Sequence, residues 1–289
     1  MTTTLPALAV RNCAQGTLNP MHAILYFAPE HTSEITAAGI KDPQGAALAA
    51  RAAALGAVGP GAVAAAFFNY DHGLLARHFP AVWREASPEV VLEARTRAAD
   101  TTLRRLLGEE VIASAEMAEA AELALRATEA CTRHGRILYS AHADLPVPEE
   151  PHLAYWHAAT LLREHRGDGH IIALVAAELD PIESLVSHTA SGLGMTPKWT
   201  KLTRGWTQEQ LDAAKDRLRA RGVLDAEGEL TPAGLDLREE VERETDRLDR
   251  APYEHLGAAG TARLTELGQG WFMKALGNGA FPRDLLGKG

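Results

Sequence analysis

Apolar positions recur along most of this chain at the spacing of an α-helix, and the clearest example begins at Thr207. Leu211 and Leu218 lie two turns apart, so one face of this stretch can pack on a core. Thr207 is suited to be the N-cap, and Gln210 completes a capping box. The pattern predicts a helix that ends before Gly222, a residue suited to the left-handed backbone beyond a helix C-terminus.

The residues after this helix predict a short β-ribbon through 225–229 and then another helix, because Thr231-Pro232 is a typical helix start. Upstream, Ser87-Pro88-Glu89 predicts the start of a helix that reaches about Leu107. The proline-rich segment 145–151 excludes a regular helix and resembles a linker. We therefore expect three consecutive parts: a helical domain over 1–150, connecting helices over 151–183, and a winged-helix domain with C-terminal helices over 184–289.

The composition supports a mainly helical, water-soluble protein. The chain has 289 residues, of which 46% are hydrophobic and only 6% aromatic, and alanine is abundant. Such a composition favours close-packed helices over sheets. The N-terminal residues lack the order of a signal peptide, and no apolar run reaches the roughly 20 residues of a membrane span. These features predict a cytoplasmic protein with no membrane partner.

Two stretches of the chain resemble known families. Arg217 to Leu224, followed by Leu230-Thr231-Pro232-Ala233-Gly234, resembles the recognition helix, wing and following helix of MarR-type regulators. Nearly the whole chain also resembles an actinobacterial family that joins a helical N-terminal region to a MarR-like winged helix; the resemblance rests on Tyr26 to Glu30, Trp156 to His170 and Arg204-Gly205-Trp206. It implies a mainly α fold, with a helical N-terminal domain and a winged-helix C-terminal domain that carries a small β-ribbon.

DNA binding by the predicted winged helix would place the helix after Thr207 in the major groove. Gln208 and Gln210 would face base edges, and Lys215 and Arg219 would meet phosphates. The net charge of −9 and the acidic ribbon Asp225–Glu229 oppose this interpretation, because acids close to phosphates repel them. DNA is therefore a disfavoured partner.

The densest run of polar residues is Trp156 to His170, which predicts a chemical site. His157 and Glu164 would share one helical face, and a break at 166–169 would let Asp168 cap a new helix and turn His170 toward the same pocket. Histidines beside carboxylates suit acid–base catalysis, so His157, Glu164 and His170 are the catalytic candidates. The ligand-binding candidates are three polar residues of this run and an aromatic group upstream: Arg163, Arg166, Asp168, Phe68, Asn69 and Tyr70.

A structural interpretation of the same residues stands beside the functional one. Asp168 would then serve only as an N-cap, His157 as a hydrogen-bonded core histidine, and Phe68 and Tyr70 as ordinary core. The sequence has no HExxH, GxGxxG or Walker motif, so we predict no metal site and assign no cofactor. A three-histidine metal site built from distant residues such as His22, His72 or His188 stays open as an alternative.

Two functions follow from these observations. The first is a small-molecule (metabolite) binding protein that uses the pocket near 157–170, with enzymatic activity left open and the winged helix not used conventionally for DNA. The alternative is a ligand-responsive MarR-type transcriptional regulator that binds DNA as a homodimer.

Overall fold

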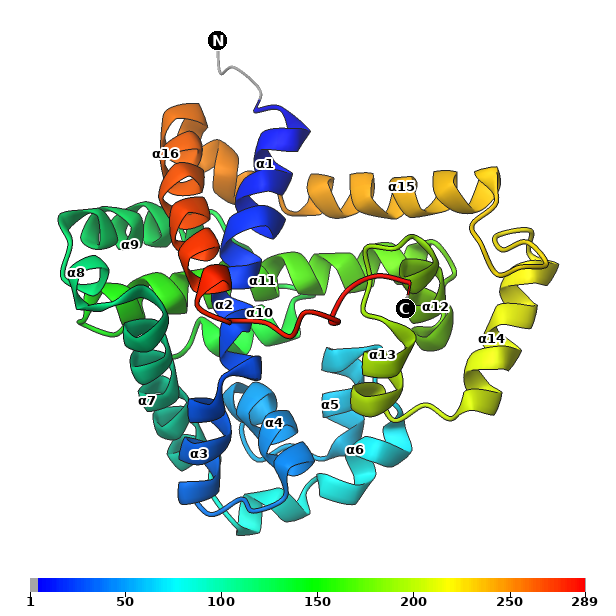
Figure 1. Ribbon diagram of the computed structural model, residues 1–289, viewed down its shortest axis with the longest axis horizontal. Coiled ribbons are helices and arrows are strands. Elements are labelled where there is room, and N and C mark those ends of the chain that lie inside the picture. The colour runs from blue at the N-terminus through cyan, green and yellow to red at the C-terminus, as the bar shows by residue number, and fades with distance from the viewer. Residues whose placement is uncertain (1–4, 289) are drawn as a thin grey trace. The chain divides into compact units, whose positions relative to one another are not determined.

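The computed structural model describes residues 5–288, and its regular elements are helices (Figure 1). They divide between two compact units that alternate along the chain: unit 1 comprises 1–57, 82–169 and 246–281, and unit 2 comprises 58–81, 170–245 and 282–289. The proline-rich segment 145–151 lies inside unit 1, between two of its helices.

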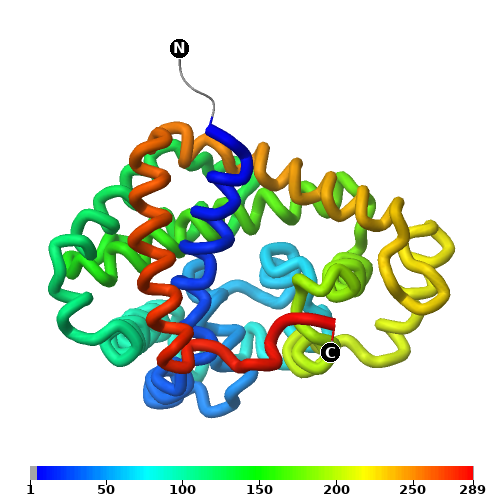
Figure 2. Tube along the Cα trace, turned by 45° about the horizontal axis from the view of Figure 1, so that its top comes forward, coloured from blue at the N-terminus to red at the C-terminus, as the bar shows by residue number. Residues whose placement is uncertain are grey.

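Unit 1 contains most of the helices. They are α1 (Ala7–Cys13), α2 (Asn19–Ala23), α3 (Pro29–Ala37), α4 (Pro43–Ala52), α7 (Pro88–Leu107), α8 (Glu109–Ile112), α9 (Ala115–Thr128), α10 (Ile137–His142), most of α11 (Pro151–Ala176) and α16 (Arg250–Gly277). The first and last of these helices lie side by side (Figures 1 and 2). They share a core with α7, α9 and α11 that includes Leu18, Met21, Leu103 and Tyr155.

Unit 2 contains α5 (Pro60–Phe67), α6 (His72–His78), α12 (Pro181–Ala190), α13 (Pro197–Arg204), α14 (Gln208–Ala220) and most of α15 (Pro232–Leu248). Its core joins α12 to α14 and to the segment after it, through Leu179, Leu211, Leu218 and Val223. The C-terminal segment returns to α13, where the Thr196 amide donates to the Leu285 carbonyl at 3.0 Å.

The expected starts of α7, α14 and α15, and the expected end of α14, are confirmed. Thr207 and Gln210 form the capping box of α14, and Gly222 has a φ of +70° just beyond its end. The Ser87 hydroxyl accepts from the Val90 amide at the start of α7, and the Thr231 hydroxyl accepts from the Gly234 amide at the start of α15. Local side-chain chemistry thus fixed these boundaries.

The prediction of a winged helix with a small β-ribbon is wrong, although the mainly α class is confirmed. Between residues 5 and 288 there is no strand, and the expected ribbon is a single antiparallel bridge between Leu224 and Leu230. The Asp225 amide and the Glu229 carbonyl, 2.9 Å apart, close the turn directly. The Thr231 amide also donates to the Val223 carbonyl at 3.1 Å. The pairing goes no further because the Val223 amide donates to the Leu218 carbonyl and Pro232 begins α15.

The predicted helix break at 166–169 is also wrong, because α11 runs unbroken through both glycines. Each glycine costs about 1 kcal/mol in a helix relative to alanine. Packing explains why position 169 is a glycine, because a Cβ there would lie 2.8 Å from Nη1 of Arg136. Asp168 consequently caps a different helix: its carboxylate accepts from the Tyr139 amide in the first turn of α10, at 2.9 Å.

No single helix within residues 5–288 is both long and apolar enough to cross a membrane. The helical segments Pro43–Leu55 and Pro60–Phe67 meet that length and composition only when they are combined as a bent pair.

Candidate functional site

Most polar residues of α11 that belong to unit 1 are buried, and Arg163 is half-buried. His157 is 6% exposed and Glu164 is 1% exposed, and both lie on the side of α11 that faces other helices of unit 1. Glu164 has its closest contact with its neighbour Arg163, at 2.5 Å between Oε1 and Nη1. Nη2 of Arg51, from the end of α4, lies 3.7 Å from the other oxygen of Glu164.

Glu164 is ionised in this environment. Burial alone would raise the pKa of its carboxyl, but Arg163 and Arg51 outweigh burial and lower that pKa to about 2. A carboxylate held this way accepts hydrogen bonds and has no proton to donate near neutral pH.

Arg95 of α7 is the least satisfied charged group in unit 1. It is 3% exposed, and its guanidinium lies 4.9 Å from the ring centroid of Trp156. Nη1 donates to Nε2 of His142 at 3.0 Å, whereas Nε and Nη2 have no hydrogen-bond partner within the described residues. Burial lowers the pKa of Arg95, but an arginine retains its proton in proteins. Two donors of a buried cation therefore lack an acceptor.

The histidines around Arg95 are neutral. Burial, together with Arg95, lowers the pKa of His142, His31 and His157 to about 4. Nδ1 of His142 lies 2.9 Å from the Leu138 carbonyl, which requires the proton on Nδ1 and leaves Nε2 to accept from Arg95. His22 is also neutral, because burial and Arg163 hold its pKa well below its usual range. These rings therefore add no charge at neutral pH.

We call Arg51, Arg95, Arg163 and Glu164 the arginine cluster. Three guanidinium groups face one ionised carboxylate, and each of the three arginines acts electrostatically on Glu164. Arg95 is buried, and Arg51 and Arg163 are half-buried. An excess of positive charge in or beside the interior is costly unless an anion compensates it. The cluster is therefore chemically suited to hold an anion. A guanidinium can donate two parallel hydrogen bonds to two oxygens of one carboxylate or phosphate.

The other polar candidates of α11 form a separate network. Arg166 donates to Asp246 at 2.8 Å, and Nδ1 of His165 lies 2.8 Å from Oδ1 of Asp249. Arg11 of α1 also binds Asp246, at 2.6 Å. This network connects α1 and α11 to the junction of α15 and α16. Arg166 therefore has a structural role, through its hydrogen bond to Asp246.

The third catalytic candidate, His170, lies in unit 2 and in the middle of α11. Its Nδ1 is 2.9 Å from the hydroxyl of Thr245. The expectation that His170 lies at a helix N-terminus is wrong, because the helix does not restart at Asp168.

Phe68, Asn69 and Tyr70 also lie in unit 2, at the end of α5. Phe68 has a φ of +56° and packs against the core of this unit. The Asn69 carbonyl accepts from the indole of Trp206 at 3.0 Å, and the ring of Tyr70 lies 4.4 Å from the guanidinium carbon of Arg204. These residues attach α5 to the turn between α13 and α14, while their ligand-binding role stays a prediction.

Sequence reasoning missed half of the arginine cluster, since Arg51 and Arg95 come from α4 and α7. One signal for Arg95 was present. The buried stripe of α7 contains Val91, Ala94, Ala98 and Thr102, and Arg95 falls within that stripe. A charged residue on an apolar helical face is rare without a partner, and it marks a candidate site.

The four residues predicted to contact DNA are engaged inside unit 2. Gln210 closes the capping box, and Gln208 donates to Asp212 at 2.9 Å. Lys215 pairs with Asp212 at 3.1 Å, and Arg219 pairs with Asp216 at 2.9 Å.

The outer face of α14 carries the exposed acids Glu209, Asp212 and Asp216, while Leu211, Ala214 and Leu218 are buried. Arg217 of the same helix is also exposed, but it already pairs with Asp180 and Glu183. Acidic side chains also outnumber basic ones in unit 2 as a whole. This face offers phosphates little attraction.

Within residues 5–288, no group of three or more histidine, cysteine, aspartate or glutamate side chains is arranged to hold a metal ion. The search of curated proteins gave no match, and neither did the search of solved structures. A family model does match residues 11–282, which is nearly the whole chain. The protein therefore belongs to a helix-turn-helix family.

Proposed function

We propose that this helix-turn-helix protein binds a small anionic metabolite at the arginine cluster. The observation that carries the proposal is Arg95, a buried cation with two donors that have no partner in the described chain. Buried donors in proteins nearly always have a partner, so an acceptor from outside the chain is expected. The neutral histidines supply further hydrogen bonds, and Nε2 of His157 is itself without a partner.

The cluster favours binding over acid–base catalysis. Glu164 is fixed as a carboxylate and His157 is neutral, so neither has the pKa near neutrality that proton transfer requires. The ligand class is a small carboxylate or phosphate, because both present oxygens in the spacing of a guanidinium fork.

Replacing Arg95 by methionine is expected to weaken anion binding by roughly tenfold to a hundredfold, the loss of one or two charge-assisted hydrogen bonds. Isothermal titration with inorganic phosphate, succinate and citrate measures the effect. Methionine retains the apolar stem, and within the described residues the change removes a single hydrogen bond of Arg95, the one to His142.

The control is Arg97→Met on the same helix, where the side chain is 54% exposed and pairs with Glu34. This variant should bind like the wild type. Equal binding by Arg95→Met, or no binding of any of the three anions to the wild type, would refute the proposal.

DNA binding through α13 and α14 is the second candidate, and the family match favours it. The acidic outer face of α14 leads us to expect no retardation of the upstream DNA of its own gene at physiological salt in a gel-shift experiment. Salt-sensitive retardation that is lost in Arg219→Glu would instead establish DNA recognition by α14.

A further inference from the structure

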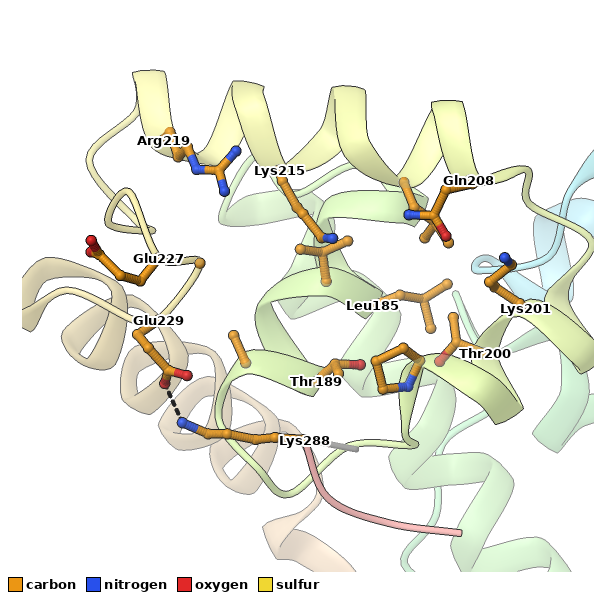
Figure 3. A pocket seen from close by; sticks show the side chains of 15 residues that line it. Leu185, Thr189, Thr200, Lys201, Gln208, Lys215, Arg219, Glu227, Glu229 and Lys288 are labelled. Atoms are coloured by element: carbon orange, nitrogen blue, oxygen red, sulfur yellow. Dashed lines mark hydrogen bonds and ion pairs between the residues drawn. The ribbon is translucent and has the colours of Figure 1, made fainter. Parts of the chain in front are cut away.

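Unit 2 contains a pocket of about 230 Å³ between α12, α13 and α14 (Figure 3). Leu185 and Thr189 come from α12, Thr200 and Lys201 from α13, and Gln208, Lys215 and Arg219 from α14. Glu227 and Glu229 border one end, and Lys288 of the C-terminal segment forms an ion pair with Glu229 there.

The lining of this pocket combines apolar and cationic side chains. The apolar ones come from α12, α13 and α14: Leu185, Val186, Ala190, Pro197 and Leu211. Most of the cationic ones already have acidic partners. Lys215 pairs with Asp212 and Arg219 pairs with Asp216. Lys201 is the exception, because its ammonium acts on Asp212 only through its field and forms no ion pair within the part of the chain described here.

The hydroxyl of Thr200 is a second polar group that lines the pocket. Thr200 is 3% exposed, and its hydroxyl has no hydrogen-bond partner within residues 5–288. It is adjacent in sequence to Lys201, and both residues line the pocket. A buried hydroxyl without a partner is uncommon and indicates an acceptor or donor supplied from outside.

We propose that this pocket is a second ligand site, distinct from the arginine cluster, and that it binds a small organic carboxylate with an apolar body. The carboxylate accepts from the Lys201 ammonium and the Thr200 hydroxyl, and the body packs on Leu185 and Leu211. The volume is below the roughly 300–1,000 Å³ of pockets for drug-sized ligands, which favours a small monocarboxylate over a nucleotide. Such a ligand touches α12, α13 and α14 together.

Hexanoate is the probe, and hexanol and sulfate are the comparison compounds. Isothermal titration on the full chain should show hexanoate binding, with hexanol weaker by roughly tenfold because it lacks the charge. Sulfate should bind here weakly or not at all, because it lacks the apolar body. Lys201→Gln is expected to weaken hexanoate binding by roughly tenfold, and Thr200→Val by roughly fivefold.

Lys198→Gln is the matched control. Lys198 lies three residues earlier on α13, pairs with Asp284 at 2.6 Å and does not line the pocket, so hexanoate affinity should be unchanged. Arg95→Met should also retain hexanoate binding, which separates this site from the arginine cluster. Equal affinity of Lys201→Gln and wild type, equal affinity for hexanol and hexanoate, or no binding at about 10 mM hexanoate would overturn the proposal.

Discussion

Replacing Glu164 by glutamine is expected to lower the free energy of unfolding by roughly 3–5 kcal/mol near pH 7. The glutamine has the same shape, but it leaves the buried Arg95 and the half-buried Arg51 and Arg163 without a compensating negative charge. Removing one partner of a buried ion pair lowers the stability of the fold by far more than the intact pair adds to it. The reason is that the remaining charge stays desolvated. Urea unfolding of wild type and variant measures the difference.

The pH dependence gives an independent check. The folded-state pKa of Glu164, about 2, is below its ordinary value of 4.5, so its ionised form stabilises the fold above pH 4.5. That contribution is lost as the pH falls from 4.5 toward 2, and the difference between wild type and Glu164→Gln should shrink over this window. Glu119→Gln, which removes an exposed pair with Arg263, should change little. Equal stability of Glu164→Gln and wild type near pH 7 would contradict the expectation.

Replacing Gly268 by alanine is expected to destabilise unit 1 by roughly 1–3 kcal/mol, the usual cost of overpacking a core. A Cβ at this position in α16 would lie 2.1 Å from Cγ2 of Thr17 and 2.9 Å from the hydroxyl of Tyr155. Thr17 is fully buried and its own hydroxyl binds the Asn12 carbonyl, so it has little room to move. Denaturant unfolding followed by tryptophan fluorescence measures the change.

Gly270→Ala is the matched control for this substitution. Gly270 is exposed on the same helix, and a Cβ there would meet nothing within 4 Å. Alanine should stabilise the helix by about 0.5–1 kcal/mol through its higher helix propensity. The two substitutions thus have opposite signs, and two losses of similar size would show that the close approach of α16 to Thr17 is not the cause.

The candidate site was only partly predictable. The density of polar residues from 156 to 170 drew attention to α11, and His157, Arg163 and Glu164 take part in or border the arginine cluster. Their role in a site stays a prediction. The interpretation of Asp168 and His170 depended on a helix break that two glycines suggested. The packing of Arg136 against Gly169 and the capping of α10 by Asp168 retain the helix instead, and neither contact is visible in local sequence.

The helical class and many helix ends follow from local sequence. Ser87, Asp180, Thr207 and Thr231 cap their helices through bonds to residues two or three positions away, so the information is local. Which side chains share a site depends instead on how the helices pack. Arg51, Arg95 and Glu164 lie on three helices far apart in the sequence, and their charges become significant because packing removes them from water. Burial depends on the whole fold, whereas capping depends on a single turn.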